Sequence, residues 1–348
     1  MRILRVLLAL TLVVAGVVST IGSGAGGNSV DEIVEEMGGP GSFAGLPDTS
    51  PPDIAWVDIT VANAQDVSAT VVGAADRFSD VAAVIGAQIF PSPPSAPDLL
   101  SSNSKFELFA TVAATGEPVT ETCAVSGSVI VSGHPDNDSV SLSPADYFTL
   151  VFDACDDGNG YTLDGSFSLY VGELVGDPRS DLFRLRYALR DMTLTIASDA
   201  DNYTASNGIW LSFDSLSFPV IVLTSDDPDS LQLSYQADVY SWHWWYLGSQ
   251  SLVINADTAI SATLSEAKKT VVESAFLSGS ISYETIVPLQ SPDGQNLESG
   301  EILVDGDEGN GTIRIVIESS ASVRLDIDSD GDGIVDDIQY TTWAALLG

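Results

Sequence analysis

The chain reads Tyr147-Phe-Thr-Leu-Val-Phe-Asp153, then Asp156-Asp-Gly-Asn-Gly160, then Tyr161-Thr-Leu-Asp-Gly-Ser-Phe-Ser-Leu-Tyr-Val171. The two outer runs are rich in aromatic and β-branched residues at alternate positions, which is typical of strands. The Asp- and Gly-rich run between them is typical of a hairpin turn. We therefore predict that these two runs pair as antiparallel neighbours.

Similar runs with a period of two, separated by turn residues, continue from about Lys105 to the C-terminus. The further predicted strands are residues 126–132, 182–197, 205–213, 220–224, 231–240, 244–255, 258–264, 276–285, 300–304, 312–317 and 323–327. Their short, regular spacing favours a mainly β fold, a large antiparallel meander that forms an open curved sheet or a sandwich. We assign residues 105–348 to this domain.

The N-terminal part differs in composition. Arg2 and Arg5 precede an apolar run at residues 6–18 and small residues at 19–27, the pattern of a signal peptide, which we place at residues 1–22. The apolar run is short for a membrane span. No cysteine lies near the cleavage region, so the sequence does not predict a lipoprotein. We expect an exported protein that is periplasmic, outer-envelope-associated or extracellular.

A Gly- and Pro-rich leader follows at residues 23–55, and a helical segment with a Pro-rich linker at residues 56–104. Asn63 is a candidate N-cap, and an apolar stripe at helical spacing runs from Ala64 to Phe78. A second short helix is predicted at residues 80–88. Prolines at four positions, Pro91, Pro93, Pro94 and Pro97, predict the end of the helical part.

The charge is strongly acidic, with 12 Lys+Arg against 49 Asp+Glu and a formal net charge of −37. The hydrophobic fraction of 45% excludes a disordered chain. Such a charge repels nucleic acid and anionic lipid surfaces and attracts cations. The acidic residues indicate either cation binding in many loops or a surface adapted to salty water.

The chain has two cysteines, Cys123 and Cys155, and no CxxC motif. In an exported protein such a pair predicts one structural disulfide, the alternative being two buried thiols. If residues 123–131 and 147–155 pair as a hairpin, Val131 faces Tyr147 and the two cysteines face each other.

The C-terminal run Asp326-Ile-Asp-Ser-Asp-Gly-Asp-Gly-Ile-Val-Asp-Asp-Ile-Gln339 predicts a calcium loop, because carboxylates at alternate positions converge on a hard cation. Starting the loop at Asp328 gives these ligands: Asp328, Asp330, Asp332, the carbonyl of Ile334, Asp336 and, at the twelfth position, Gln339. If the loop starts at Asp326 instead, Asp337 takes the twelfth position, but Gly333 takes the position at which such loops have an apolar residue. The other interpretation is a solvated acidic turn. The flanks read as strands, so we expect the ion to stabilise a strand connection.

The motif Asp328-Ser-Asp-Gly-Asp-Gly-Ile-Val-Asp336 resembles the calcium loops of thrombospondin type 3 and dockerin modules. The chain also resembles a group of uncharacterised exported bacterial β-sheet proteins. The residues that carry this likeness are Cys123-Ala-Val-Ser-Gly127, Asp146-Tyr-Phe-Thr-Leu-Val-Phe-Asp-Ala-Cys155, Gly165-Ser-Phe-Ser-Leu169 and Thr341-Thr-Trp343. The resemblance implies an envelope location and no known activity.

An aromatic run, Trp242-His-Trp-Trp-Tyr246, is the other candidate site. On a strand, Trp242, Trp244 and Tyr246 share one face, and Trp245 lies on the other. They form either a platform for a sugar or a lipid, or an aromatic strand packed on both faces. Catalysis is not indicated, because the chain has only His134 and His243, no GxSxG motif and no metal-ligand spacing around either histidine.

The sequence therefore predicts an exported, calcium-stabilised β protein with a non-enzymatic role. That role is the binding of a lipid or another hydrophobic ligand, or adhesion, with an envelope protein as a further possible partner. Two other functions stay open at this point: a secreted carbohydrate-binding or carbohydrate-active protein that uses residues 242–246, and an outer-membrane β-barrel. The oligomeric state is not predicted.

Overall fold

The computed structural model describes residues 55–89, 105–134, 143–158, 160–176, 183–198, 202–214, 216, 220–226, 231–236, 241–246, 250–255, 261–266, 270–292, 297–306 and 311–347. Between residues 217 and 270 the backbone of the strands is described without side chains. The predicted signal segment, most of the leader and the Pro-rich linker lie outside these residues.

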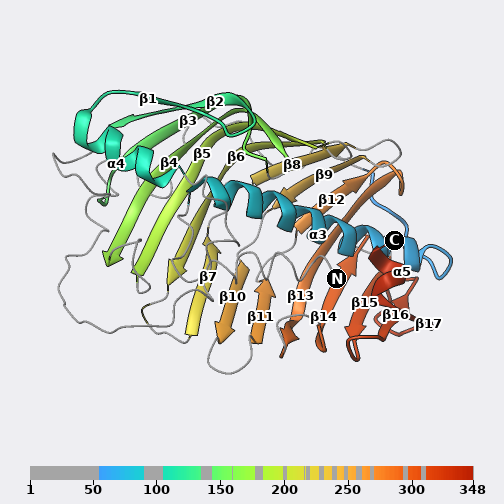
Figure 1. Ribbon diagram of the computed structural model, residues 1–348. Coiled ribbons are helices and arrows are strands. Elements are labelled where there is room, and N and C mark those ends of the chain that lie inside the picture. Colours follow the sequence, from blue (N-terminus) through green and yellow to red (C-terminus); the bar gives the residue numbers. More distant parts are fainter. Residues whose placement is uncertain are drawn as a thin grey trace.

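The prediction of a mainly β fold is confirmed. Within the described residues, seventeen strands form one antiparallel sheet, which is curved (Figure 1). The strands are β1 Val119–Thr122, β2 Ser126–His134, β3 Tyr147–Asp156, β4 Thr162–Gly176, β5 Phe183–Ala197, β6 Asn202–Asp214, β7 Val220–Asp226, β8 Leu231–Gln236, β9 Ser241–Tyr246, β10 Gln250–Asn255, β11 Ser261–Glu266, β12 Thr270–Ser274, β13 Gly279–Ser291, β14 Ser299–Asp305, β15 Thr312–Ile317, β16 Val323–Asp328 and β17 Asp337–Thr341.

The six short strands β7–β12 in the middle of the sheet form three long strands, each with one interruption: β7 with β8, β9 with β10, and β11 with β12. Strands β9 and β12 pair with Trp245 opposite Val271, and five positions further on β10 and β11 pair with Gln250 opposite Glu266, so the register continues unchanged. Strands β7 and β8 pair in turn with the two ends of β6. The whole sheet is therefore a meander of long strands, in which β7 and β8, β9 and β10, and β11 and β12 follow each other end to end.

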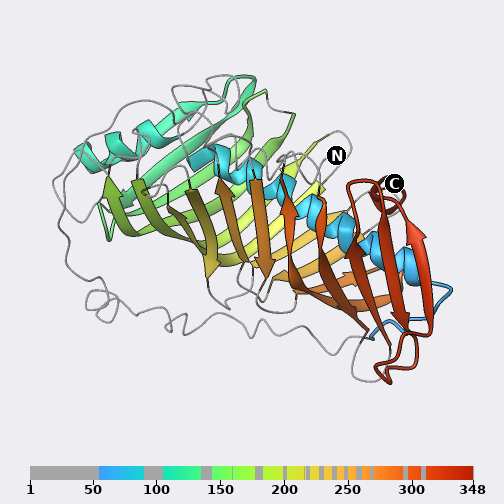
Figure 2. The ribbon, with the colours of Figure 1, turned by 90° about the horizontal axis from the view of Figure 1, so that it is seen from below.

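A long helix, α3 (Ala64–Ile89), lies across the strands along the concave face of the sheet (Figure 2). Its buried residues, among them Val67 and Val71, belong to one hydrophobic core with alternate residues of the strands, such as Ile313 and Ile315 of β15. The short helix α5 (Trp343–Leu347) contacts α3.

Two helix predictions were wrong. The chain forms one continuous helix in place of the two predicted at residues 63–88, because the segment contains no proline and its apolar stripe continues to Ile89. A further helix, α4 (Phe106–Thr115), occupies the start of the predicted β region. It buries Phe109, Val112 and Ala113, a helical spacing. It ends at Gly116, whose left-handed backbone lets its N–H bond the carbonyl of Val112.

Candidate metal centre

Residues 328–336, which we call the Asp loop, connect β16 to β17. Strand β16 anchors the loop because Val323, Leu325 and Ile327 point into the core and are fully buried. The two strands pair in register from Val323 opposite Thr341 to Ile327 opposite Asp337. The prediction that the loop lies between strands is therefore confirmed.

Three of the predicted ligands lie together in this loop. Asp328, Asp330 and Asp332 each place one carboxylate oxygen within 4.8 Å of the others. Asp328 is 7% exposed at the end of β16, and the other two carboxylates are exposed. Gly331 and Gly333 have φ angles of 70° and 84°, in the left-handed region that glycine adopts without strain. These two residues allow the backbone to fold so that the alternate aspartates gather on one side.

Backbone N–H groups orient all three carboxylates. The two oxygens of Asp328 accept hydrogen bonds from the N–H groups of Gly331, at 2.8 Å, and Gly333, at 2.7 Å. One oxygen of Asp330 accepts from the N–H of Asp332, and one oxygen of Asp332 accepts from the N–H of Ile334. Oriented carboxylate oxygens of this kind match the ligand preference of a hard divalent cation.

Asp336 lies in the same loop but outside the group of three. One of its carboxylate oxygens accepts hydrogen bonds from the hydroxyl and from the backbone N–H of Ser329, the latter at 2.8 Å. These bonds favour the ionised form and lower the pKa of Asp336. Asp336 also donates its own N–H to the carbonyl of Ile327 at 2.7 Å. Asp336 thus closes the base of the loop.

Of the two remaining predicted ligands, Ile334 lies in the loop and Gln339 lies outside it, on the following strand. Gln339 is on β17, and its side-chain amide nitrogen donates to the carbonyl of Val61 at 2.9 Å. Ile334 has its backbone in the loop and an exposed side chain. The structure therefore brings together Asp328, Asp330 and Asp332, and places Gln339 at a contact with the segment before α3.

That segment, residues 55–63, is an element that the sequence analysis missed, and we call it the strap. It begins with hydrogen bonds between Ala55, Val57 and Ser280, and it passes beside Gly311. A Cβ atom at Gly311 would lie 2.8 Å from the carbonyl oxygen of Asp328 and 2.9 Å from that of Ile59. The strap therefore packs directly beside the start of the Asp loop. Val57, Ile59 and Val61 alternate with polar residues in the manner of a short strand, a pattern that was overlooked because the segment is so short.

The predicted disulfide between Cys123 and Cys155 is confirmed, with a Cα–Cα distance of 5.5 Å. The register from which it was argued is wrong, because Val131 pairs with Leu150 and Tyr147 with His134. Cys123 lies in the connection between β1 and β2, outside the paired residues, and its N–H donates to the carbonyl of Gly127. This turn, and not the β2–β3 ladder, places Cys123 beside Cys155, and it passes through Gly127, where a Cβ atom would collide with the carbonyl of Ala154.

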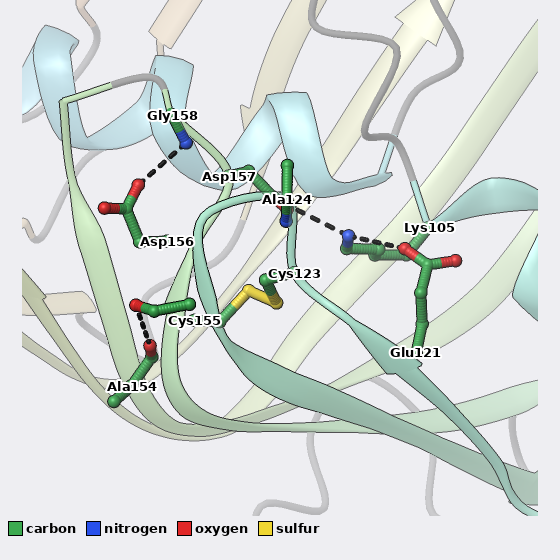
Figure 3. Close-up of a disulfide and its surroundings, with 10 residues drawn as sticks. Lys105, Glu121, Cys123, Ala124, Ala154, Cys155, Asp156, Asp157 and Gly158 are labelled. Carbon is green, nitrogen blue, oxygen red and sulfur yellow. Dashed lines mark hydrogen bonds and ion pairs between the residues drawn. A yellow bond between two sulfur atoms is a disulfide. The ribbon is translucent and has the colours of Figure 1, made fainter.

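A buried lysine lies beside this disulfide (Figure 3). The side chain of Lys105 is 1% exposed, and its Nζ lies 2.8 Å from Glu121 and 3.2 Å from Asp157. The contact with Asp157 is an ion pair without hydrogen-bond geometry. The backbone N–H of Lys105 donates to the carbonyl of Gln88, so this residue joins the end of α3 to β1. A buried position for Lys105 was not predictable from its residue type, because lysine is rarely buried.

The aromatic run lies on β9, an interior strand. Trp244 pairs with Leu233 of β8 on one side and with Val272 of β12 on the other. The side chains of Trp242, Trp244, Trp245 and Tyr246 lie outside the described part, so their role as a binding platform stays a prediction. His134 ends β2 opposite Tyr147, and the backbone of His243 pairs with Glu273.

Comparison with models of protein families, with curated proteins and with solved structures gives no match for this chain. Of the helices that the structure describes, none combines the length and the apolar composition needed to cross a membrane.

Proposed function

We propose that this protein is an exported, calcium-stabilised β protein that binds a partner molecule and has no catalytic role. The observation that carries the calcium part is the group formed by Asp328, Asp330 and Asp332, with oxygens within 4.8 Å of one another. Carboxylates this close repel one another, and a bound divalent cation offsets that repulsion. Calcium takes six to eight oxygens in flexible geometry, which loop carboxylates, carbonyls and water supply together.

The disulfide supports export, because disulfides persist in oxidising compartments outside the cytosol. It joins the β1–β2 connection to the end of β3, next to the ion pairs of Lys105. The Asp loop lies near the other end of the chain. In this proposal, a covalent bond therefore holds one end of the meander and a calcium ion the other.

The proposed ligand is a lipid or another hydrophobic molecule that enters between α3 and the concave face of the sheet. Two fully buried side chains on α3, Ser68 and Gln88, have no hydrogen-bond partner for their polar atoms among the described residues. An unpartnered buried polar group costs about 1–3 kcal/mol. The interface between α3 and the sheet is thus weaker than an entirely apolar one. In this proposal, α3 therefore separates from the sheet easily enough for a hydrophobic ligand to take its place.

Isothermal titration of the mature protein with calcium chloride tests the metal part. We expect one site per chain, lost in Asp330→Asn and retained in the control Asp164→Asn, which changes an exposed aspartate on β4. Absence of calcium binding to the unaltered protein refutes this part.

Native mass spectrometry of protein purified without detergent tests the ligand part. We expect a bound hydrophobic molecule that organic solvent releases. A protein that is free of ligand after purification, and that takes up no fatty acid or phospholipid when these are added, refutes the ligand part. Adhesion or a structural role in the envelope would then be the better proposal.

A further inference from the structure

The last strand of the meander has an open edge. Strand β17 pairs with β16 through five residues, from Asp337 to Thr341. In the part of the chain that the structure describes, β17 pairs with no other strand, since β2 pairs with β1 and β3. Within those residues its other edge is thus unpaired, a situation that proteins normally avoid or use.

The side chains of β17 are arranged in the reverse of the strands beside it. On β16 the residues that face the core are Val323, Leu325 and Ile327, all buried. The β17 residues opposite them are polar: Thr341, Gln339 and Asp337. The apolar residues Ile338 and Tyr340 lie on the other face and are 51% and 68% exposed. An edge strand with its apolar residues in solvent indicates that this edge has a partner.

The sequence of β17 is complementary to itself. When two copies are placed antiparallel about a two-fold axis at Gln339, each Ile338 lies opposite a Tyr340, and each Asp337 opposite a Thr341. A β-branched residue opposite an aromatic residue is a favourable cross-strand pair, and no two carboxylates face each other. We propose that β17 pairs with β17 of a second copy of this chain and that the two meanders form one continuous sheet in a symmetric dimer.

Charge is the main obstacle to self-association in a chain of net charge −37. The two-fold arrangement reduces it, because the two Asp loops lie at opposite ends of the paired strands. Five strand residues span about 16 Å, which exceeds the Debye length of about 8 Å at physiological ionic strength. Beside Tyr340 on the outer face, Arg324 bonds Asp326 at 2.7 Å and Glu318 at 3.2 Å, so its positive charge offsets part of the negative charge next to the contact.

The other edge of the sheet is a poorer partner for β17. Strand β1 has four residues, and its Glu121 is held by Lys105 from the start of α4. Pairing of β17 with β1 of another copy would also leave one free β1 edge and one free β17 edge on each pair. Further copies could then add at both ends and form open chains of molecules. Pairing of β17 with itself closes after two copies, so the two arrangements predict different assembly sizes.

Sedimentation of the mature protein at increasing concentration, in calcium-containing buffer, tests the proposal. We expect a reversible monomer–dimer equilibrium, because a contact of two short strands is smaller than a standard interface of about 1,600 Å². Tyr340→Lys should weaken dimerisation at least tenfold. The control Val125→Lys makes the same charge change at an exposed apolar residue far from β17 and should leave it unchanged. A monomer at every concentration, or growth into larger oligomers, overturns the proposal.

A cross-linking experiment tests the register independently of affinity. Gln339 lies on the proposed axis and faces its own copy, so Gln339→Cys should form an intermolecular disulfide on mild oxidation. Thr341→Cys should not, because Thr341 faces Asp337 of the other copy. Absence of a dimer with Gln339→Cys, or equal cross-linking by both variants, overturns the two-fold register. The melting temperature of each variant shows whether its fold is intact.

Discussion

The side-chain amide of Gln339 donates a hydrogen bond to the carbonyl oxygen of Val61, which joins two residues 278 positions apart in the chain. Gln339 belongs to the last strand, and Val61 belongs to the strap that leads into α3. The contact therefore holds the beginning of the folded chain against its end, next to the Asp loop.

The first prediction tests whether Gln339 stabilises the fold through its hydrogen bond to Val61 or binds calcium. Gln339→Ala should lower the free energy of unfolding by about 0.5–1.5 kcal/mol, the usual contribution of one hydrogen bond. It should change the calcium affinity less than twofold. Urea unfolding and calcium titration of the same variant measure both effects, and a large loss of affinity would show that Gln339 binds the ion.

The second prediction concerns calcium and stability. A ligand that binds only the folded state stabilises it by about 2.7 kcal/mol at a hundred times its dissociation constant. For a chain of this size that corresponds to a rise in melting temperature of about 5 °C. EGTA should abolish the rise, and Asp330→Asn should remove most of it, whereas Asp164→Asn should behave like the unaltered protein. An equal calcium response in Asp330→Asn would contradict the assignment.

The third prediction is a dependence on pH from Asp336. Its pKa in the folded state is lowered by the two hydrogen bonds from Ser329. The contribution of this pair is therefore complete above the carboxyl pKa of the unfolded chain and is lost as pH falls through the lower, folded pKa. Ser329→Ala removes the hydroxyl donor, so the loss of stability as the pH falls below the carboxyl pKa of the unfolded chain should become shallower. Calcium-free unfolding curves at several pH values measure this, and identical slopes would refute it.

The fourth prediction concerns Lys105. Lys105→Met removes the positive charge beside Asp157, whose side chain is 4% exposed. Breaking a buried ion pair by removing one partner costs about 3–5 kcal/mol. Adding Asp157→Asn in the same chain removes the uncompensated buried carboxylate and should recover part of this loss. Glu121→Gln changes the more exposed partner and should cost less. Chemical unfolding of the three variants compares these costs, and an unchanged stability of Lys105→Met would contradict the prediction.

The fifth prediction concerns Gln88, which lies near the end of α3. Gln88→Leu replaces a buried, unpartnered amide by an apolar side chain of similar size, so we expect a gain of about 1–3 kcal/mol in stability. The same change should reduce uptake of the hydrophobic ligand, because α3 then leaves the sheet less readily. A variant that is more stable but binds the ligand as before would show that movement of α3 is not required for ligand binding.

The sheet was predictable wherever one face of a strand is buried, since alternation of apolar residues then appears directly in the sequence. Strand β3 shows this well, with Phe148, Leu150 and Phe152 in the core. Strand β1 was missed because Val119–Thr122 contains no alternation of this kind. The cysteine register failed because Cys123 lies in the turn at residues 123–127 and not on a strand that pairs with β3.

The Asp loop was predictable in part. The three carboxylates at alternate positions gather as expected, because the glycines between them fix a local turn. The partners of Asp336 and Gln339 were not predictable from spacing. Ser329 competes for Asp336 within the loop, and the contact of Gln339 depends on a strap far away in the sequence.

The order of the strands has a consequence for how the chain folds. In the meander, each strand pairs with strands that are close to it in the sequence, so the sheet can form progressively from either end. The strap is different, because Ile59 and Val61 meet residues near 311 and 339. Contacts of such high sequence separation form late. Although α3 precedes every strand, its docking must therefore wait until the final hairpin has formed.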